Sequence, residues 1–276
     1  MTAAQKKQLL ATAVKAAHAA GDIMRRNRLA LKKINEVTQR DIKLELDVRC
    51  QRKIESILTR THPEIGILGE EENVGDIETG LRWVVDPIDG TVNFTYGIPH
   101  ACVSIALQRR LAKRNQYGDD YETVVGAVFD PFTDELWTAI RGQAAKLNGK
   151  KISVNDGGLR EALLSIGFAK DKKTMEYMMP YFSKLAPKIR KPRMMGSATL
   201  ALTYVASGRF HGYIESKVNL WDIAAGGLII ECAGGEFWRM PRKKGDHTYA
   251  VIASNGRIRK QIERVCGPLD PDGVLN

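Results

Sequence analysis

Residues 83–94, WVVDPIDGTVNF, join an apolar run to a group of side chains that can bind ions. Residues 83–85 are predicted to end an interior strand, and the chain is predicted to turn away from it at Asp86. Pro87 fixes its own φ and restricts the residue before it, which holds the carboxylates of Asp86 and Asp89 in a set relation. Two carboxylates at one strand end suit a hard cation. The same residues are typical of an ordinary turn at a strand end, so on this stretch alone a cation site and a simple turn both stay open.

The residues around Asp89 also favour an anion beside that cation. The predicted turn leaves backbone carbonyls such as that of Ile88 free to bind. Gly90 permits a close approach of the backbone, and a helical turn beginning at Thr91 would direct its N–H groups toward an anion. A cation and a phosphate are therefore predicted to meet at this strand end.

Three consecutive acids, residues 70–72, follow a short predicted strand over 64–68. They repel one another unless solvent or a cation lies between them, and a solvated loop would explain them. Because the Asp86 stretch follows so soon in the chain, a carboxylate directed at the same cation is the favoured interpretation, with Glu70 first after the strand.

A second informative stretch is YIESKVNLWDIAAGGLIIECAGG, residues 213–235. Asn219 can cap a helix whose first turn contains Asp222, and this pair is close to a capping box, which would explain the acid without any metal. Two features favour a functional site instead. Glu215 is predicted to end the strand just upstream, and the glycine pair 226–227 weakens the helix unless something packs closely there.

The composition is that of a globular protein able to bury a substantial core, as one large domain or two closely packed halves with a boundary near residue 150. The charge is +10, from 42 basic and 32 acidic residues. The basic clusters at 109–114, 188–193 and 239–244 contain no interleaved aromatic residues, so a solvated surface is favoured over nucleic-acid binding. The electrostatic field of a surface with net positive charge also favours an anionic substrate.

The four cysteines are widely spaced, which argues against a zinc site or a disulfide framework and indicates reduced core thiols. With no apolar run long enough for a membrane span, a cytoplasmic location is expected. The remaining periodicity predicts the following elements: helices over 3–30, from Asp47 to Pro63, over 173–187 and over 197–207; a loop or short hairpin over 32–41; and strands over 100–108, 123–129, 135–140 and 162–168, mostly antiparallel, with turns at 130–134 and 148–149.

Three dispersed motifs together carry a family resemblance: GEE at 69–71, the stretch at 83–94 followed by GIPH at 97–100, and WDIAAGGLIIECAGG at 221–235. In order and spacing the chain resembles the inositol monophosphatase family of magnesium-dependent, lithium-sensitive phosphatases, from its first helix to about residue 266. The resemblance implies an α/β (α+β) fold of the α-β-α-β-α layered-sandwich type, usually in a homodimer. It divides the chain into an N-terminal half, 1–150, with the metal motifs, and a C-terminal half, 151–276, which completes the active site of a single compact unit.

The resemblance also implies two to three Mg²⁺ ions and inhibition by Li⁺. One ion would be held by Glu70, Asp86 and the carbonyl of Ile88. A second would be held by Asp86, Asp89 and Asp222, and Glu70 with water would reach a weaker third. All of these are oxygen ligands, as magnesium demands.

Reaction roles follow from the same resemblance. The N–H groups of Gly90 and Thr91 would bind the phosphate oxygens, and Thr91 with Asp47 would orient and deprotonate the attacking water. The reaction would be a direct in-line hydrolysis with no phosphoenzyme.

Substrate contacts would come from Glu215, Asp89 and the backbone at Ala198, which suits an inositol ring or another small polyol. The sequence departs from the family pattern at Leu44, where relatives usually have a threonine. The expected activity is the hydrolysis of myo-inositol-1-phosphate. Alternatives are the same chemistry on fructose-1,6-bisphosphate, histidinol phosphate or 3'-phosphoadenosine 5'-phosphate, or, in another class, a binding protein for RNA or protein that uses the basic surface.

Overall fold

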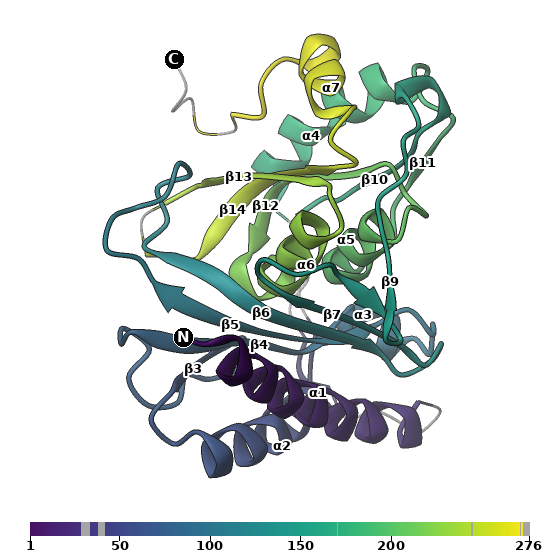
Figure 1. Ribbon diagram of the computed structural model, residues 1–276. Coiled ribbons are helices and arrows are strands. Elements are labelled where there is room, and N and C mark those ends of the chain that lie inside the picture. Colours follow the sequence, from purple (N-terminus) through teal and green to yellow (C-terminus); the bar gives the residue numbers. More distant parts are fainter. Residues whose placement is uncertain (29–33, 38–41, 170, 244, 271, 273–276) are drawn as a thin grey trace.

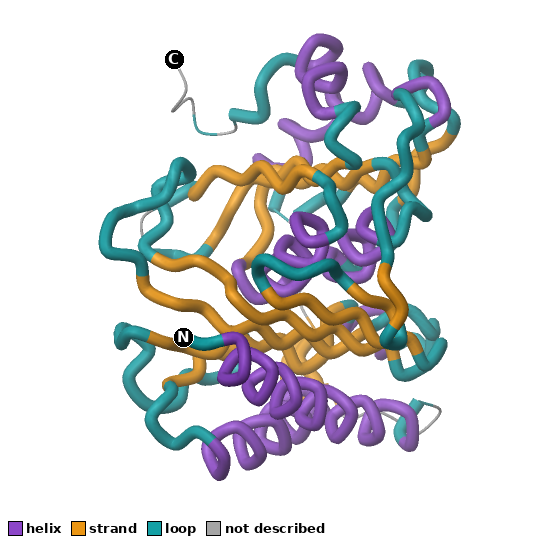
Figure 2. Tube along the Cα trace, viewed as in Figure 1, coloured by secondary structure: helices purple, strands orange, loops and turns teal. Residues whose placement is uncertain are grey.

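Helices and sheets alternate in five stacked layers in the computed structural model (Figure 1). α1 (Ala3–Arg26) and α2 (Glu45–Thr61) form one outer layer, and α4 (Lys172–Leu185) and α7 (Arg259–Cys266) form the other. α5 (Ala198–Ala206) and α6 (Leu220–Cys232) lie between the two large sheets (Figure 2). The predicted α-β-α-β-α sandwich is confirmed. The structure describes residues 1–28, 34–37, 42–169, 171–243, 245–270 and 272.

The first sheet is antiparallel except for its first pair of strands. Within the described residues its order is β3-β4-β5-β6-β7-β8-β9, and β3 and β4 are parallel. These strands span Gly66–Gly69, Leu81–Asp89, Cys102–Arg110, Tyr121–Asp130, Glu135–Ile140, Lys146–Leu147 and Lys150–Lys151. The predicted antiparallel middle region and its two hairpin turns are therefore confirmed.

The second sheet is mixed and comes from the later part of the chain. In the part of the chain that the structure describes, its order is β11-β10-β12-β14-β13. In chain order from β10 to β14, its strands span Leu163–Ile166, Lys191–Arg193, Gly212–Asn219, Glu236–Pro241 and Thr248–Ser254. The first sheet ends at Lys151, close to the predicted boundary at residue 150, and the division of the chain into two halves stays a prediction.

Four short elements complete the fold: α3 (Thr91–Thr95), the 3-10 helix η1 (Leu159–Glu161), and an antiparallel hairpin of β1 (Ile34–Val37) and β2 (Ile42–Leu44). β1 is the described part of the segment predicted as a loop or short hairpin over 32–41, and its partner β2 lies just beyond that segment. The rest of the segment lies outside the described residues. The first helix, predicted to reach residue 30, ends at Arg26. The side chain of Leu44, where the sequence departs from the family pattern, also lies outside what the structure describes.

Three predicted positions are wrong by a few residues. The turn predicted at Asp86 begins only after Asp89, because β4 continues past Pro87 through a shift in register: Asp86 pairs with Ser104 and Asp89 with Cys102. Proline has no N–H to donate, and a bulge is a place in a sheet that tolerates this.

The other two wrongly predicted positions are those of Asp47 and Glu215. α2 begins at Glu45, directly after β2, so Asp47 lies buried in its first turn and does not cap it. Glu215 lies in the middle of β12, because that strand continues to Asn219 by pairing with β14 beyond a second register shift.

The described helices include none that is both long and apolar enough to cross a membrane. All four cysteines are free thiols. Cys50 and Cys102 are buried, as expected of core thiols, whereas Cys232 and Cys266 are only half-buried.

α6 is apolar on nearly all sides because it is enclosed between the two sheets, unlike α1 and α2, which bury one face each. Its glycine pair permits this enclosure. A Cβ added at Gly226 would lie 2.8 Å from Cβ of Leu202 in α5, so the two helices touch through a position where only hydrogen fits. The close packing that the glycine pair predicted is present.

We expect Gly226→Leu to lower the free energy of unfolding by about 2 kcal/mol or more, because overpacking at this helix contact outweighs the better helix propensity of leucine. Urea unfolding at constant m-value measures the effect. The matched control is Gly80→Leu, at a position where an added Cβ would meet nothing within 4 Å. Equal stability of the two variants would contradict the close contact between α5 and α6.

Candidate active site

Three carboxylates from two separate segments converge at the end of β4. Asp86, Asp89 and Asp222 each direct one oxygen into a group whose members all lie within 4.8 Å of one another. Asp86 and Asp89 are buried in the first sheet, and Asp222 comes from the first turn of α6. Groups of this spacing are able to share a cation.

The bulge in β4 gives its two aspartates their separate directions. Oδ1 of Asp86 accepts a hydrogen bond from the N–H of Ile88 at 2.9 Å, which fixes the carboxylate against its own strand. The other oxygen, Oδ2, is buried and has no hydrogen-bond partner among the described residues. A buried carboxylate oxygen without a donor is energetically unfavourable unless an ion or a proton compensates it.

Asp89 is held by the N-terminal end of α5, which belongs to the later half of the chain. Its Oδ2 accepts hydrogen bonds from Oγ of Ser197 at 2.6 Å and from the N–H of Thr199 at 2.7 Å. Ser197 also caps α5, as the sequence predicts, because its Oγ accepts from the N–H of Leu200. Its second role, as a donor to Asp89, carries no signal in the sequence.

Asp222 combines the two roles that the sequence left open. Its Oδ2 accepts a hydrogen bond from the N–H of Asn219 at 3.0 Å, which is the capping contact. Its carboxylate also belongs to the group of three. Thr199 donates its hydroxyl to the carbonyl of Asp222 at 2.7 Å, so that α5 positions both Asp89 and Asp222.

Glu70 follows β3 directly and lies beside Asp86. The N–H of Glu70 donates to the carbonyl of Val85 on β4, and its carboxyl lies close enough to that of Asp86 for each to affect the pKa of the other. Its neighbour Glu71 is positioned elsewhere, with its N–H donating to Oε1 of Gln51. Of the three consecutive acids, the first is therefore the one brought to the cluster.

Thr91 and Asp47 meet at the open side of the cluster. The Thr91 hydroxyl lies 3.3 Å from Oδ1 of Asp47 and 2.9 Å from the carbonyl of Ile88, and donates to these two oxygens. Gly90 precedes α3 with a left-handed φ of 93°, and a Cβ there would lie 2.8 Å from the carbonyl oxygen of His100. Glycine is therefore required for the backbone to enter α3 at this angle.

A cavity of about 710 Å³ opens above these groups. Its walls contain Glu70, Asp86, Asp89 and Asp222 and also the remaining predicted site residues Ile88, Gly90, Thr91, Ala198 and Glu215. Asp47 lies behind Thr91. Glu215 accepts a hydrogen bond from the hydroxyl of Tyr213, two residues earlier on the same strand. Tyr213 is a wall residue that the sequence analysis missed, although the i, i+2 spacing from Glu215 could have suggested it.

The cluster raises the pKa of its own carboxyl groups. Burial raises the pKa of Glu70 and of Asp86 well above the ordinary range, and repulsion from neighbouring carboxylates raises both further. The pKa of Asp222 is raised to about 7 for the same two reasons, burial and repulsion from a neighbouring carboxylate. Burial raises the pKa of Glu215 to about 8. Burial also raises the pKa of Asp89, and the hydrogen bonds from Ser197 and Thr199 oppose that rise.

The donor set fits a small, hard divalent cation. Every candidate ligand is a carboxylate or carbonyl oxygen, and no nitrogen or sulfur ligand belongs to the group among the described residues. The partnerless Oδ2 of Asp86 and the raised pKa values identify negative charge that a cation would neutralise. Mg²⁺ prefers this chemistry.

Comparison with known proteins decides the family. The model of the inositol monophosphatase family matches residues 5–266. The chain belongs to the inositol monophosphatase family. It is accordingly a phosphatase, and the resemblance found in the sequence is confirmed.

Relatives span nearly the whole chain. The Rhizobium meliloti protein "Inositol-1-monophosphatase" is 37% identical over 80% of this chain and 81% of its own. The Xylella fastidiosa protein "Nus factor SuhB" is 35% identical over 91% of this chain and 92% of its own. Among solved structures, an inositol monophosphatase from Anabaena superposes with a TM-score of 0.80 at 29% identity, covering 96% of this chain and 98% of that one.

We expect the metal-free protein to lose stability as the pH rises from about 4 to about 8. Carboxyl groups such as Asp222, whose folded pKa lies above the unfolded value, bind more protons in the folded state throughout that window, so their ionisation favours unfolding. Asp222→Asn removes one such group. In chelator, its free energy of unfolding at pH 8 is expected to exceed that of the unmodified protein by about 1 to 3 kcal/mol, with little difference at pH 4.

Urea titrations at the two pH values measure this prediction. Asp156→Asn makes the same change at an exposed carboxyl and serves as the control. If the free energy of unfolding has the same pH dependence in Asp222→Asn and Asp156→Asn, the acidic cluster is not the source of the loss of stability at high pH.

Proposed function

We propose that the chain is a Mg²⁺-dependent phosphomonoesterase that hydrolyses inositol monophosphate to inositol and phosphate. The observation that carries this proposal is the partnerless oxygen of Asp86 within a cluster of oxygen donors, beside the Thr91–Asp47 pair. The activity named for the Rhizobium meliloti relative supports the substrate class.

The ligand assignment follows the family pattern. Glu70, Asp86 and the carbonyl of Ile88 would hold one ion, and Asp86, Asp89 and Asp222 a second, with Glu70 reaching a weaker third. The carbonyl of Ile88 already accepts from Thr91, and its second lone pair remains for a cation. When bound, the ions supply a water nucleophile of lowered pKa and neutralise charge on the leaving oxygen. We include sensitivity to Li⁺ in the proposal.

The protein's own groups orient the reactants. The N–H groups of Gly90 and Thr91, at the entrance to α3, would hold the phosphate oxygens. Thr91 would hold the attacking water through its hydroxyl, and Asp47, buried behind it, would take the proton. With the water on one side of the phosphorus and the leaving alcohol on the other, transfer would be in line without a covalent enzyme intermediate.

Glu215, Asp89 and the backbone at Ala198 would contact the polyol. The Tyr213 hydroxyl fixes the Glu215 carboxyl, which leaves its other oxygen for ring hydroxyl groups. The cavity volume of about 710 Å³ accommodates a cyclitol phosphate but equally another small sugar phosphate. Fructose-1,6-bisphosphate, histidinol phosphate and 3'-phosphoadenosine 5'-phosphate therefore remain the alternatives.

The basic clusters give little support to a nucleic-acid function. Arg109 pairs with Glu122, Arg114 with Asp120, and Arg242 with Asp272, which reduces the positive charge that these clusters present. Some relatives, such as the Xylella fastidiosa protein, are named Nus factor. The homodimer and the cytoplasmic location stay predictions.

The proposal is tested by assaying a panel of phosphate monoesters with Mg²⁺, with Li⁺ and in chelator. We expect inositol monophosphate to be hydrolysed with the highest kcat/KM, only when Mg²⁺ is present. Preference by an order of magnitude for fructose-1,6-bisphosphate or histidinol phosphate would overturn the substrate assignment, and full activity in chelator would overturn the metal assignment.

Glu215→Gln tests the polyol contact separately. Loss of one charge-assisted hydrogen bond, worth about 1.5 to 3 kcal/mol, is expected to reduce kcat/KM for inositol monophosphate by tenfold or more, mainly through KM. An aryl phosphate without ring hydroxyl groups serves as the control and is expected to lose much less. Equal losses on both substrates would place Glu215 in the reaction itself.

A further inference from the structure

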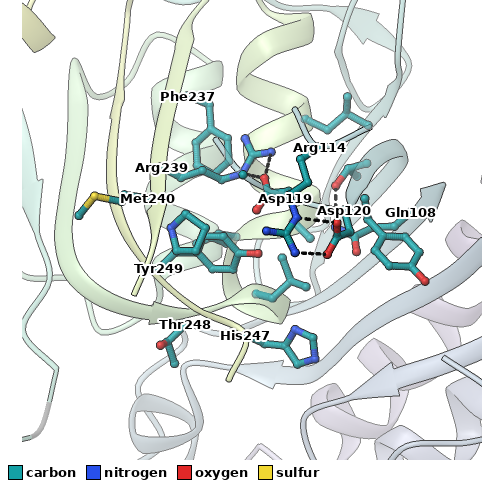
Figure 3. Close-up of a pocket in the computed structure, with 18 of the residues that line it drawn as sticks. Gln108, Arg114, Asp119, Asp120, Phe237, Arg239, Met240, His247, Thr248 and Tyr249 are labelled. Carbon is teal, nitrogen blue, oxygen red and sulfur yellow. Dashed lines mark hydrogen bonds and ion pairs between the residues drawn. The ribbon is translucent and has the colours of Figure 1, made fainter. Parts of the chain in front are cut away.

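A second cavity, of about 520 Å³, lies on the other side of α6 from the acidic cluster. None of its wall residues also lines the active-site cavity. It is formed by the ends of β5 and β6, the loop between them, α6, β13 and β14, and Figure 3 shows the labelled part of its wall. The activity proposed above makes no use of it.

Ion pairs neutralise three of the arginines in this wall. Arg239 lies 2.6 Å from Asp119, Arg114 lies 2.9 Å from Asp120, and Arg141 lies 2.8 Å from Glu231. Figure 3 shows Arg239 facing Asp119 and Arg114 facing Asp120. Each of these three arginines thus has a carboxylate partner within 3 Å.

Arg82 differs from the other three. Its side chain is 6% exposed, yet it donates one hydrogen bond, from Nε to Oε1 of Gln108 at 3.0 Å. The nearest carboxylate oxygen, on Glu78, lies 3.9 Å from Nη1, which is beyond hydrogen-bond distance. Both terminal nitrogens of this guanidinium therefore have no hydrogen-bond acceptor among the described residues.

The setting of Arg82 orients its charge and only partly compensates it. The guanidinium stacks on the ring of Tyr121, with its central carbon 3.7 Å from the ring centroid, which orients the plane. Burial lowers the pKa of Arg82, so the carboxylate of Glu78, 3.9 Å away, does not fully offset the loss of water. The terminal nitrogens of Arg82 keep their hydrogen-bonding capacity for a molecule that enters the cavity.

Two facing sides of the wall are apolar and suit the body of such a molecule. Ile223, Ala224 and Leu228 of α6 form one side. Phe237, Met240 and Tyr249, from β13 and β14, form the opposite side, and Figure 3 shows these three close to one another. A slot with aliphatic and aromatic sides and the buried guanidinium of Arg82 favours a flat apolar group bearing one negative charge, and the exposed Lys243 in the same wall adds positive charge.

We propose that this cavity is a binding site for a small organic anion, with its carboxylate, sulfonate or phosphate on Arg82 and a flat apolar body against α6. Arg82 offers two terminal nitrogens in a fixed plane, which matches the two oxygens of such a group. The ligand lies beside the helix that carries Asp222 but touches none of the proposed catalytic groups.

The probe for this site is 8-anilinonaphthalene-1-sulfonate, whose fluorescence rises in apolar surroundings. We expect saturable binding of one dye per chain. N-phenyl-1-naphthylamine, the same aromatic body without the sulfonate, is expected to bind at least about tenfold more weakly, because the bond to a charged donor is lost.

Two variants locate the dye. Arg82→Gln is expected to weaken the sulfonate dye about tenfold and to remove its advantage over the neutral one, whereas Ala224→Leu, which fills the slot, weakens both. Arg109→Gln, an exposed arginine outside the cavity, is the matched control and is expected to change neither.

Equal affinity of the two dyes for the unmodified protein overturns the proposal, and this comparison needs no variant to fold. The same affinity of the sulfonate dye for Arg82→Gln and for Arg109→Gln overturns it as well.

Discussion

The structure depends on holding several carboxylates together where water cannot separate them. Glu70, Asp86, Asp89 and Asp222 repel one another, and burial strengthens that repulsion, as their raised pKa values indicate. Such a cluster persists only if surrounding elements are stable enough to impose it. The two sheets, with α5 and α6 enclosed between them, provide that stability through apolar packing.

Hydrogen bonds distribute the strain unevenly over the cluster. Asp89 receives two donors from α5 and Asp222 receives one from its own cap, whereas one oxygen of Asp86 receives none. The residue with the least satisfied oxygen is thus Asp86, the one that the proposed scheme assigns to both ions. A protein that satisfied this oxygen with its own donor would be more stable and would bind a cation less well.

Apolar periodicity in the sequence predicted most of the helices and strands, whereas the layers and the full set of converging acids were implied by the family resemblance that the three motifs carry. The sequence analysis misplaced the end of β4 and the position of Glu215, since register shifts depend on the partner strand. It also missed the links from Ser197 and Thr199 to Asp89, which exist only after distant segments have packed. The cavity around Arg82 could not be predicted from the sequence either, because its wall comes from many separate stretches of the chain.

The hydrogen bond between Ser197 and Asp89 joins positions 108 residues apart in the chain. Contacts of such long sequence separation form late, after local hairpins and helices, because a long loop must first be closed. A nascent or half-folded chain therefore carries the motif at 83–94 without the donors that shape it. The arrangement of Asp89 in the acidic cluster therefore exists only once the two parts of the chain have packed together.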